Sequence, residues 1–206
     1  MEPIVDFELF QQLKGEIENG KWIEDKEKLC IADENGWTIA HKQARRGWTT
    51  EDKEILKLSE WKGWTVAHEQ ANHGWTTEDK EILKLADELN LTVAHIQVRQ
   101  GWTTEDKEIL KLTIKKDWKA GWTVAHMQAK CGWTTEDKEI LKLADNEGWT
   151  VAHVQAINGW TTEDKEILKL ATQEGWTVAH EQAKRGWITN DKEILKLTDN
   201  RGTTVY

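Results

Sequence analysis

A twelve-residue phrase that recurs along the chain most constrains what this protein can fold into. Its first copy, Gly47–Leu58, reads Gly-Trp-Thr-Thr-Glu-Asp-Lys-Glu-Ile-Leu-Lys-Leu. The same letters begin again at Gly74, Gly101, Gly132 and Gly159. The step between copies is 27 residues except for one step of 31, and a near copy begins at Gly186. Self-similarity at a period of roughly 20–50 residues predicts a repeat array in which each unit packs on its neighbours.

A second recurring phrase predicts the first helix of each unit. Gly63–Ala71 reads Gly-Trp-Thr-Val-Ala-His-Glu-Gln-Ala, with close copies in the other units. Thr65 suits a helix N-cap, and the apolar residues Val66, Ala67 and Ala71 give one narrow face. A left-handed glycine is expected to end this helix.

The twelve-residue phrase predicts a second helix. We expect it to start at Thr76 or Thr77, where Thr-Thr-Glu-Asp has the form of a capping box. Its buried stripe is expected to be Ile82, Leu83, Leu85 and Ala86. Helices of about ten residues are not stable alone, so stacking must stabilise the pairs.

These phrases predict one repeat domain over residues 1–206. The expected parts are an N-terminal cap at 1–35, repeats at 36–62, 63–89, 90–120, 121–147, 148–174 and 175–201, and a truncated repeat start at 202–206. The repeat at 90–120 carries four extra residues within 113–120. Four residues make about one helical turn, so we expect a longer second helix or a bulged loop.

Composition excludes several classes of function. The net charge of −9 argues against binding to a nucleic-acid backbone, which needs clustered Lys and Arg. The sequence has no apolar run near the ~18 residues of a membrane span and no basic N-terminal leader. Cys30 and Cys131 lie in different repeats and predict no disulfide, so we expect a cytoplasmic protein.

The sequence offers little for catalysis. Ser59 is the only serine and Tyr206 the only tyrosine, and there is no Gly-rich phosphate loop. The Glu-Asp-Lys-Glu clusters are repeated identically, whereas an active site is single. We therefore predict no enzyme activity and no cofactor.

The units resemble the ankyrin repeat. The matching positions are Gly63, Thr65, His68, Ala71 and Gly74 with their counterparts in the other units. The resemblance covers nearly all of residues 20–206 and is strongest to short, Trp-rich ankyrin-like repeats of some bacterial and phage proteins. The unit has 27 residues rather than about 33, and Val66 stands where the family has Pro. The resemblance implies an all-α, ankyrin-like αα-solenoid of about seven helix pairs with shortened or absent β-hairpins.

One histidine recurs in each unit. The row is His41, His68, His95, His126, His153 and His180. Stacked helices lie about 8–10 Å apart, while zinc ligands lie about 2.0–2.3 Å from the ion, so successive histidines cannot share a metal. No metal site is predicted. The resemblance implies that each histidine bonds the threonine of its own N-cap and the backbone of the next unit.

Tryptophan forms two rows. The first is Trp48, Trp75, Trp102, Trp133, Trp160 and Trp187, which the resemblance places in the core of the turn between helices. The second is Trp37, Trp64, Trp122, Trp149 and Trp176. It either anchors a partner, as exposed Trp often does at interfaces, or lies flat and covers helix ends.

The copies differ most at the residue after each histidine. Ile96, Met127 and Val154 occupy this position in consecutive units, and we expect them to form an exposed apolar strip on the concave face. The predicted partner-binding residues are Trp64, Ile96, Trp122, Met127, Trp149, Val154 and Trp176.

The resulting functional hypothesis is a scaffold that recognises a partner protein through the concave face of the stack. We expect it to act as an inhibitor or effector of a host or competitor protein. One alternative is a small-ligand or glycan binder that uses the Trp row as a stacking surface. Another is a structural array that self-associates through its C-terminal end.

Overall fold

A computed structural model describes residues 2–115 and 121–206 of the chain. It divides into two compact units, Met1–Trp102 and Thr103–Tyr206. Each unit is built from short helices, and we describe the two separately.

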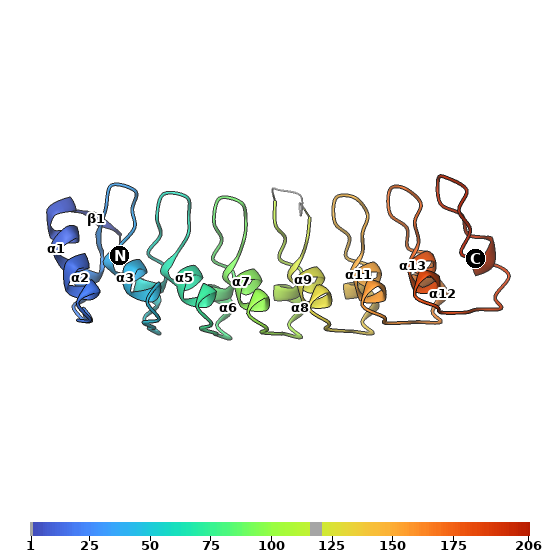
Figure 1. Ribbon diagram of the computed structural model, residues 1–206, viewed down its shortest axis with the longest axis horizontal. Helices are drawn as coiled ribbons and strands as arrows, with labels where there is room; N and C mark the ends of the chain where they lie inside the picture. Colours follow the sequence, from blue (N-terminus) through green and yellow to red (C-terminus); the bar gives the residue numbers. More distant parts are fainter. Residues whose placement is uncertain (1, 116–120) are drawn as a thin grey trace. The chain divides into compact units, whose positions relative to one another are not determined.

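The first unit begins with a small cap and continues with helix pairs (Figure 1). Its elements are β1 (Ile4–Val5), α1 (Phe7–Glu18), α2 (Lys26–Leu29), β2 (Ile31–Ala32), α3 (Ile39–Ala44), α4 (Lys53–Leu56), α5 (Val66–Asn72), α6 (Lys80–Leu83) and α7 (Val93–Arg99). The strands β1 and β2 pair in parallel. Helices α1, α3, α5 and α7 stack in order, and the short helices α2, α4 and α6 each pack on the first helix of the following repeat.

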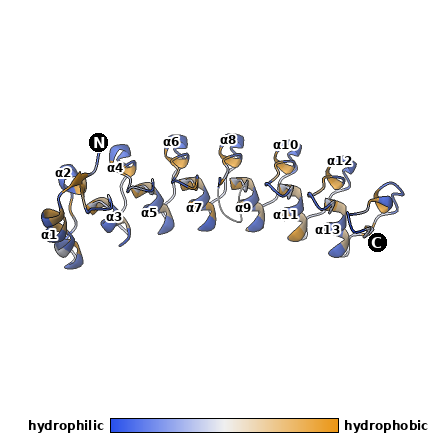
Figure 2. Cartoon of the chain, turned by 90° about the horizontal axis from the view of Figure 1, so that it is seen from above, coloured by the Kyte–Doolittle hydropathy of each residue, from blue (hydrophilic) through white to orange (hydrophobic). Residues whose placement is uncertain are grey.

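The second unit has the same arrangement (Figure 2). Its elements are α8 (Lys107–Leu110), α9 (Val124–Lys130), α10 (Lys138–Leu141), α11 (Val151–Ile157), α12 (Lys165–Leu168), α13 (Val178–Lys184) and the 3₁₀ turn η1 (Ile194–Lys196). Helices α9, α11 and α13 stack in order, and α8, α10 and α12 pack on them. The buried aliphatic residues of both rows meet between them, as Leu141, Ala152 and Ile167 do.

The predicted fold class, an all-α, ankyrin-like αα-solenoid, is confirmed by this stacking within each unit. The hairpins are shortened rather than absent, because a single antiparallel bridge closes each one, for example Ala86 with Thr92. Within each unit the hairpins lie on one side of the helices (Figure 1). Glycine usually supplies the left-handed residue in the hairpin, and Asn90 replaces it with φ of 63°. Asparagine tolerates this conformation better than most residues, which explains the substitution.

The second helix differs from the sequence-based prediction. It is one turn long, and its N-cap is Asp79 rather than a threonine. The Asp79 carboxylate accepts the backbone N–H of Glu81 at 2.9 Å, while the Thr77 hydroxyl accepts the N–H of Asp79 at 3.1 Å. Ala86 is exposed instead of buried, because the chain has already left the helix for the hairpin.

In two repeats, a glutamine of the next repeat bonds the residue two positions before this cap. Gln128 accepts the backbone N–H of Thr104 at 2.8 Å and donates to its carbonyl at 3.1 Å. Gln43 holds the equivalent residue Ile23 in the same way. The helix α10 begins at the same position although the side-chain N and O of Gln155 form no such bonds. The aspartate cap, and not the glutamine, is therefore the feature that these helix starts share.

The insertion within residues 113–120 was predicted to lengthen the second helix or to form a bulged loop. The helix α8 spans four residues, as do α6 and α10, so it is not lengthened at its own position. Ile114 is buried and donates its N–H to the Trp122 carbonyl at 2.9 Å. Residues 116–120, where the rest of the insertion falls, lie outside the described residues.

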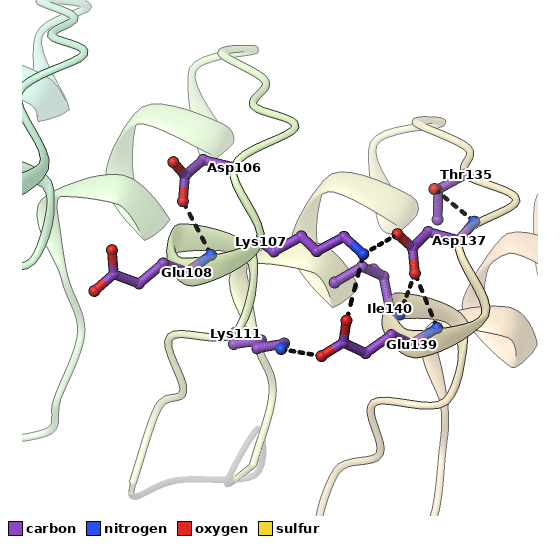
Figure 3. Close-up of polar contacts among 8 residues, drawn as sticks. All are labelled: Asp106, Lys107, Glu108, Lys111, Thr135, Asp137, Glu139 and Ile140. Atoms are coloured by element: carbon purple, nitrogen blue, oxygen red, sulfur yellow. Dashed lines mark hydrogen bonds and ion pairs between the residues drawn. The ribbon is translucent and has the colours of Figure 1, made fainter.

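The charged residues of the twelve-residue phrase connect neighbouring repeats (Figure 3). Lys107 contacts Asp137 at 2.5 Å and Glu139 at 3.3 Å, and Lys111 also pairs with Glu139. The hydrogen bond from Lys107 lowers the pKa of Asp137, and Asp137 in turn raises the pKa of Lys107. The same contact recurs between Lys138 and Asp164. Because these side chains are exposed, each pair adds little stability, but the row fixes how one repeat sits on the next.

We predict that Asp52→Ala lowers the free energy of unfolding by about 1 kcal/mol, because Asp52 caps α4 and accepts from Glu54 N–H at 3.0 Å. Urea denaturation would measure the loss. Asp52→Asn keeps a capping side chain and should lose less. Thr49→Ala changes a position at which the sequence pattern predicted the cap, and it should be nearly neutral. An equal loss from Asp52→Ala and Thr49→Ala would show that Asp52 is not the cap.

Candidate functional site

Five histidines of the row link their own repeat to the next one. In the second unit, His153 Nε2 lies 3.1 Å from the Trp176 carbonyl, and its Nδ1 lies 2.7 Å from the Thr150 hydroxyl and 3.2 Å from the Thr150 N–H. A carbonyl only accepts, so Nε2 must carry the proton and Nδ1 must accept. His41, His68, His126 and His180 make the same set of contacts. The role that the family resemblance implied for this row is thus observed.

Burial lowers the pKa of His41, His68, His126 and His153 and so favours their neutral form. It lowers the pKa of His41 to about 3 and the pKa values of His68 and His153 to about 4. A proton on Nδ1 would face the hydroxyl and the backbone N–H of the N-cap threonine, which both donate to Nδ1 of the neutral ring. Within residues 2–115 and 121–206, no three His, Cys, Asp or Glu side chains are grouped to hold a metal ion. The row is accordingly structural.

The first Trp row contacts the preceding repeat, but it is half-buried rather than part of the core. Trp75 donates its indole N–H to Glu51 at 3.0 Å, and Trp160 donates to Glu136 at 3.0 Å. The first Trp row therefore does not lie fully in the core, as the resemblance implied, because each ring remains half-buried. The indole N–H needs an acceptor, and the Glu of the twelve-residue phrase supplies it at the surface.

The second Trp row lies over the start of the first helices. The rings of Trp64 and His68 are 5.0 Å apart, and those of Trp149 and His153 are 5.5 Å apart. Every Trp of this row is half-buried. The rings therefore cover their own helix starts and still leave part of each indole accessible.

The prediction that Ile96, Met127 and Val154 form an exposed strip is wrong, because all three side chains are buried. Ile96 is 0% exposed, Met127 6% and Val154 5%. Ile96 belongs to a core cluster of buried residues against which Leu91 and Trp64 pack, and the sequence pattern does not reveal this packing. Ile96 belongs to the first unit, whereas Met127 and Val154 belong to the second.

Two repeats carry a buried glutamate where the others carry Lys, Ile, Met or Val. Glu69 accepts the indole N–H of Trp64 at 2.9 Å and the guanidinium of Arg45 at 3.1 Å. Glu181 accepts the indole N–H of Trp176 at 3.0 Å. Pairing makes the buried carboxylates tolerable in this position.

The acceptor of the indole N–H correlates with the orientation of the ring. Where a carboxylate accepts, the planes of Trp and His meet at about 30°, as for Trp64, Trp122 and Trp176. Trp149 meets His153 at 69° instead. Among the described residues, no acceptor lies within hydrogen-bonding distance of the Trp149 indole N–H. The Trp149 indole N–H is therefore available to donate a hydrogen bond, and the ring stands edge-on to His153.

The structure brings three of the predicted site residues together around one hollow in the second unit. Trp122, Trp149 and Val154 line it with Ile157, and its rim consists of Lys130, Asp145, Glu147 and Asn158. Its volume is about 420 Å³. Asp145 accepts the Trp122 indole N–H at 3.1 Å, and Lys130 lies 5.8 Å from the centre of the Trp122 ring. We call this site the Trp122–Trp149 hollow.

Two further hollows are more polar. Trp149 and Trp176 line one together with Glu147, Glu174, Glu181, Lys184, Asp199 and Arg201. In the first unit, Trp37 and Trp64 line another with Arg45, Glu60, Lys62 and Glu69. Each lies between a hairpin and the first helices, which is the face that the family resemblance indicated. The Trp122–Trp149 hollow differs because its lining is largely apolar.

Sequence reasoning missed Glu147 and Trp61. Glu147 lines both hollows of the second unit. Trp61 is 73% exposed on its hairpin, the highest exposure of any tryptophan among the described residues. Its position outside both Trp rows was the signal that could have found it. The role of Glu147 had no such signal, since hairpin residues vary from repeat to repeat.

Comparisons with known proteins identify no family for this chain. No model of a protein family matches it, and no curated protein matches its sequence. Among solved structures, it is similar to the ankyrin repeat domain of Bcl-3, described as a unique member of the IkappaB protein family. That likeness has a TM-score of 0.39 and 11% identity, and it covers 95% of this chain and 85% of the other. In the part of the chain that the structure describes, no helix is long and apolar enough to cross a bilayer.

We predict that the protein folds with Val154→Glu and that this substitution rotates the Trp149 ring. The new carboxylate takes the place that Glu69 and Glu181 occupy, where Trp149 N–H can donate to it and Lys130 corresponds to Arg45. The free energy of unfolding should fall by about 1 kcal/mol, not the ~3–5 kcal/mol of an unpaired buried charge. A downfield shift of the Trp149 indole proton by NMR would report the new bond.

Val151→Glu is the matched control, because Val151 is fully buried in the same helix and faces no indole donor in its sister repeats. It should destabilise the protein by about 3 kcal/mol or more. Equal losses from the two variants would show that the Glu69 arrangement cannot form at residue 154.

We also predict that stability falls on acidification through the histidine row. The unfolded pKa is about 6.5 and that of folded His153 about 4, so the unfolded chain takes up protons first as pH falls. Stability from this residue is complete above about pH 6.5 and is lost progressively toward pH 4. Between about pH 7 and pH 5 it should decline by about 2 kcal/mol per such histidine.

Urea denaturation of His153→Gln at several pH values tests this dependence. The variant should be less stable at neutral pH and should lose less on acidification than the parent. Lys192→Gln, which alters an exposed residue, serves as the control and should follow the parent's pH dependence. An unchanged pH dependence in His153→Gln would contradict the assignment.

Proposed function

We propose that this protein is a binding scaffold that recognises another protein through the hairpin and first-helix face of its second unit. An apolar side chain of the partner occupies the Trp122–Trp149 hollow. The hollow's combination of two half-buried indoles, Val154 and Ile157 inside a charged rim carries this proposal. Interfaces commonly place aromatic anchors in such a setting.

The surrounding structure supports binding without chemistry. Five of the buried histidines use Nε2 in hydrogen bonds to the next repeat, and carboxylates of the twelve-residue phrase pair with lysines of a neighbouring repeat. Neither set is arranged as an acid–base pair around a substrate. A scaffold of this kind acts by occupying its partner's surface, so inhibition or recruitment of that partner is the expected consequence.

The hollow also has features that favour a protein over a small ligand. Its neighbour along the same face shares Trp149 and Glu147. A surface of adjoining hollows suits an extended segment of a partner better than a single small molecule.

Affinity capture from a lysate of the source cells tests the proposal. We expect the parent to retain a protein that Val154→Glu does not retain, because the substitution places a carboxylate in the apolar hollow. Glu69→Val, the reverse change in the first unit, should retain it. Retention by the parent and by both variants would overturn the assigned site. Quenching of Trp fluorescence by sugars or nucleotides, without any retained protein, would overturn protein binding.

A further inference from the structure

We propose that the partner presents a basic segment, in which an apolar side chain enters the Trp122–Trp149 hollow and an adjacent Lys or Arg pairs with Glu147. This inference rests on the proposed function and specifies the chemistry of the partner. Its main support is the charge on the rim of the two hollows in the second unit.

Glu147 is the carboxylate best placed to meet a partner. It is exposed and lines both the apolar hollow and the polar hollow beside it. No ion pair to Glu147 is formed within the described residues. Glu174, in contrast, already pairs with Arg201 at 3.3 Å, and Glu181 is buried against Trp176. Glu147 therefore retains an unneutralised charge at the centre of the face.

The other rim charges strengthen this acidic character. Asp145 accepts three N–H groups, from Glu147 at 2.9 Å, Trp149 at 2.8 Å and Trp122 at 3.1 Å. Neutral donors stabilise its charge without cancelling it. The cation Lys130 lies against the Trp122 ring. A cation from a partner would find two carboxylates beside one apolar hollow.

The hairpins hold these carboxylates in place. The Gln173 N–H donates to the Glu147 carbonyl at 2.9 Å, and the Asn200 N–H donates to the Glu174 carbonyl at 2.9 Å. Neighbouring hairpins are thus joined through their backbones. A fixed backbone at Glu147 lets its carboxylate stand at a defined distance from the hollow, as recognition of adjacent residues in a partner requires.

Two further features fit an extended basic segment. The free Trp149 indole N–H can donate to a backbone carbonyl of a segment that lies across the hollow. The chain has a net charge of −9, which attracts positively charged partners from a distance and repels acidic ones.

A phage-displayed library of random peptides, selected on the full chain, provides the probe. We expect enriched peptides to combine an aliphatic or aromatic residue with a nearby Lys or Arg. Synthetic copies should bind less tightly in high salt, because the charge pair is screened there. Enriched peptides that are acidic or uncharged would overturn the inference.

Glu147→Lys tests the pairing directly. It should weaken a selected basic peptide by about fivefold or more at low salt, and should bind the same peptide with Glu in place of its Lys more tightly than the parent does. Glu174→Lys is the matched control on the next hairpin and should change the affinity less. Circular dichroism would confirm that both variants are folded, as expected for exposed side chains.

Val154→Glu separates this inference from the proposed function. Peptides that lose about tenfold in affinity with Val154→Glu but are unaffected by Glu147→Lys would keep the hollow as the binding site and overturn the basic partner. Peptides that bind Val154→Glu as well as the parent would overturn the site itself.

Discussion

The hydrogen bond from a buried histidine to a carbonyl of the following repeat, formed by five histidines of the row, is the constraint on which the stack depends. His153 uses one ring nitrogen for the cap of its own helix and the other for Trp176 of the next repeat. The bond therefore joins helix formation to stacking, and neither can be lost alone. Helices this short have no independent stability, so this coupling explains why the Thr-Val-Ala-His phrase is nearly constant.

The twelve-residue phrase serves the same purpose at the opposite end of each repeat. Its Glu accepts from the Trp of the next copy, and its Lys contacts the next Asp and Glu. Each of these residues contacts a neighbouring copy of the phrase, so a change in one repeat disturbs its interfaces with both neighbours. Exposed ion pairs contribute little energy one by one. Their value lies in register, because a slipped repeat would place like charges together.

Variation between the repeats is concentrated at the residue after the histidine, and there it decides what the surface offers. The residue after the histidine is Glu69 or Glu181 in two repeats, and each holds a Trp indole flat. Val154 cannot accept that proton, and Trp149 stands edge-on beside an apolar hollow. One side chain thus changes both the polarity of a hollow and the orientation of the ring that lines it.

The sequence by itself determined the repeat, the helix pairs and the Thr65 cap, because these follow from local spacing and hydrogen-bonding capacity. The bonding role of the histidines was implied by the resemblance to the ankyrin repeat. The positions of Trp122, Trp149 and Val154 in the repeats also led to their prediction as partner-binding residues. Only the tertiary structure decided the rest. The second helix starts at an aspartate rather than a threonine, and Gln128 bonds the backbone of Thr104 outside it. Ile96, Met127 and Val154 are buried, so the expected exposed strip does not form. Contacts between repeats form only in the folded stack, and a linear pattern carries no record of which residues they cover.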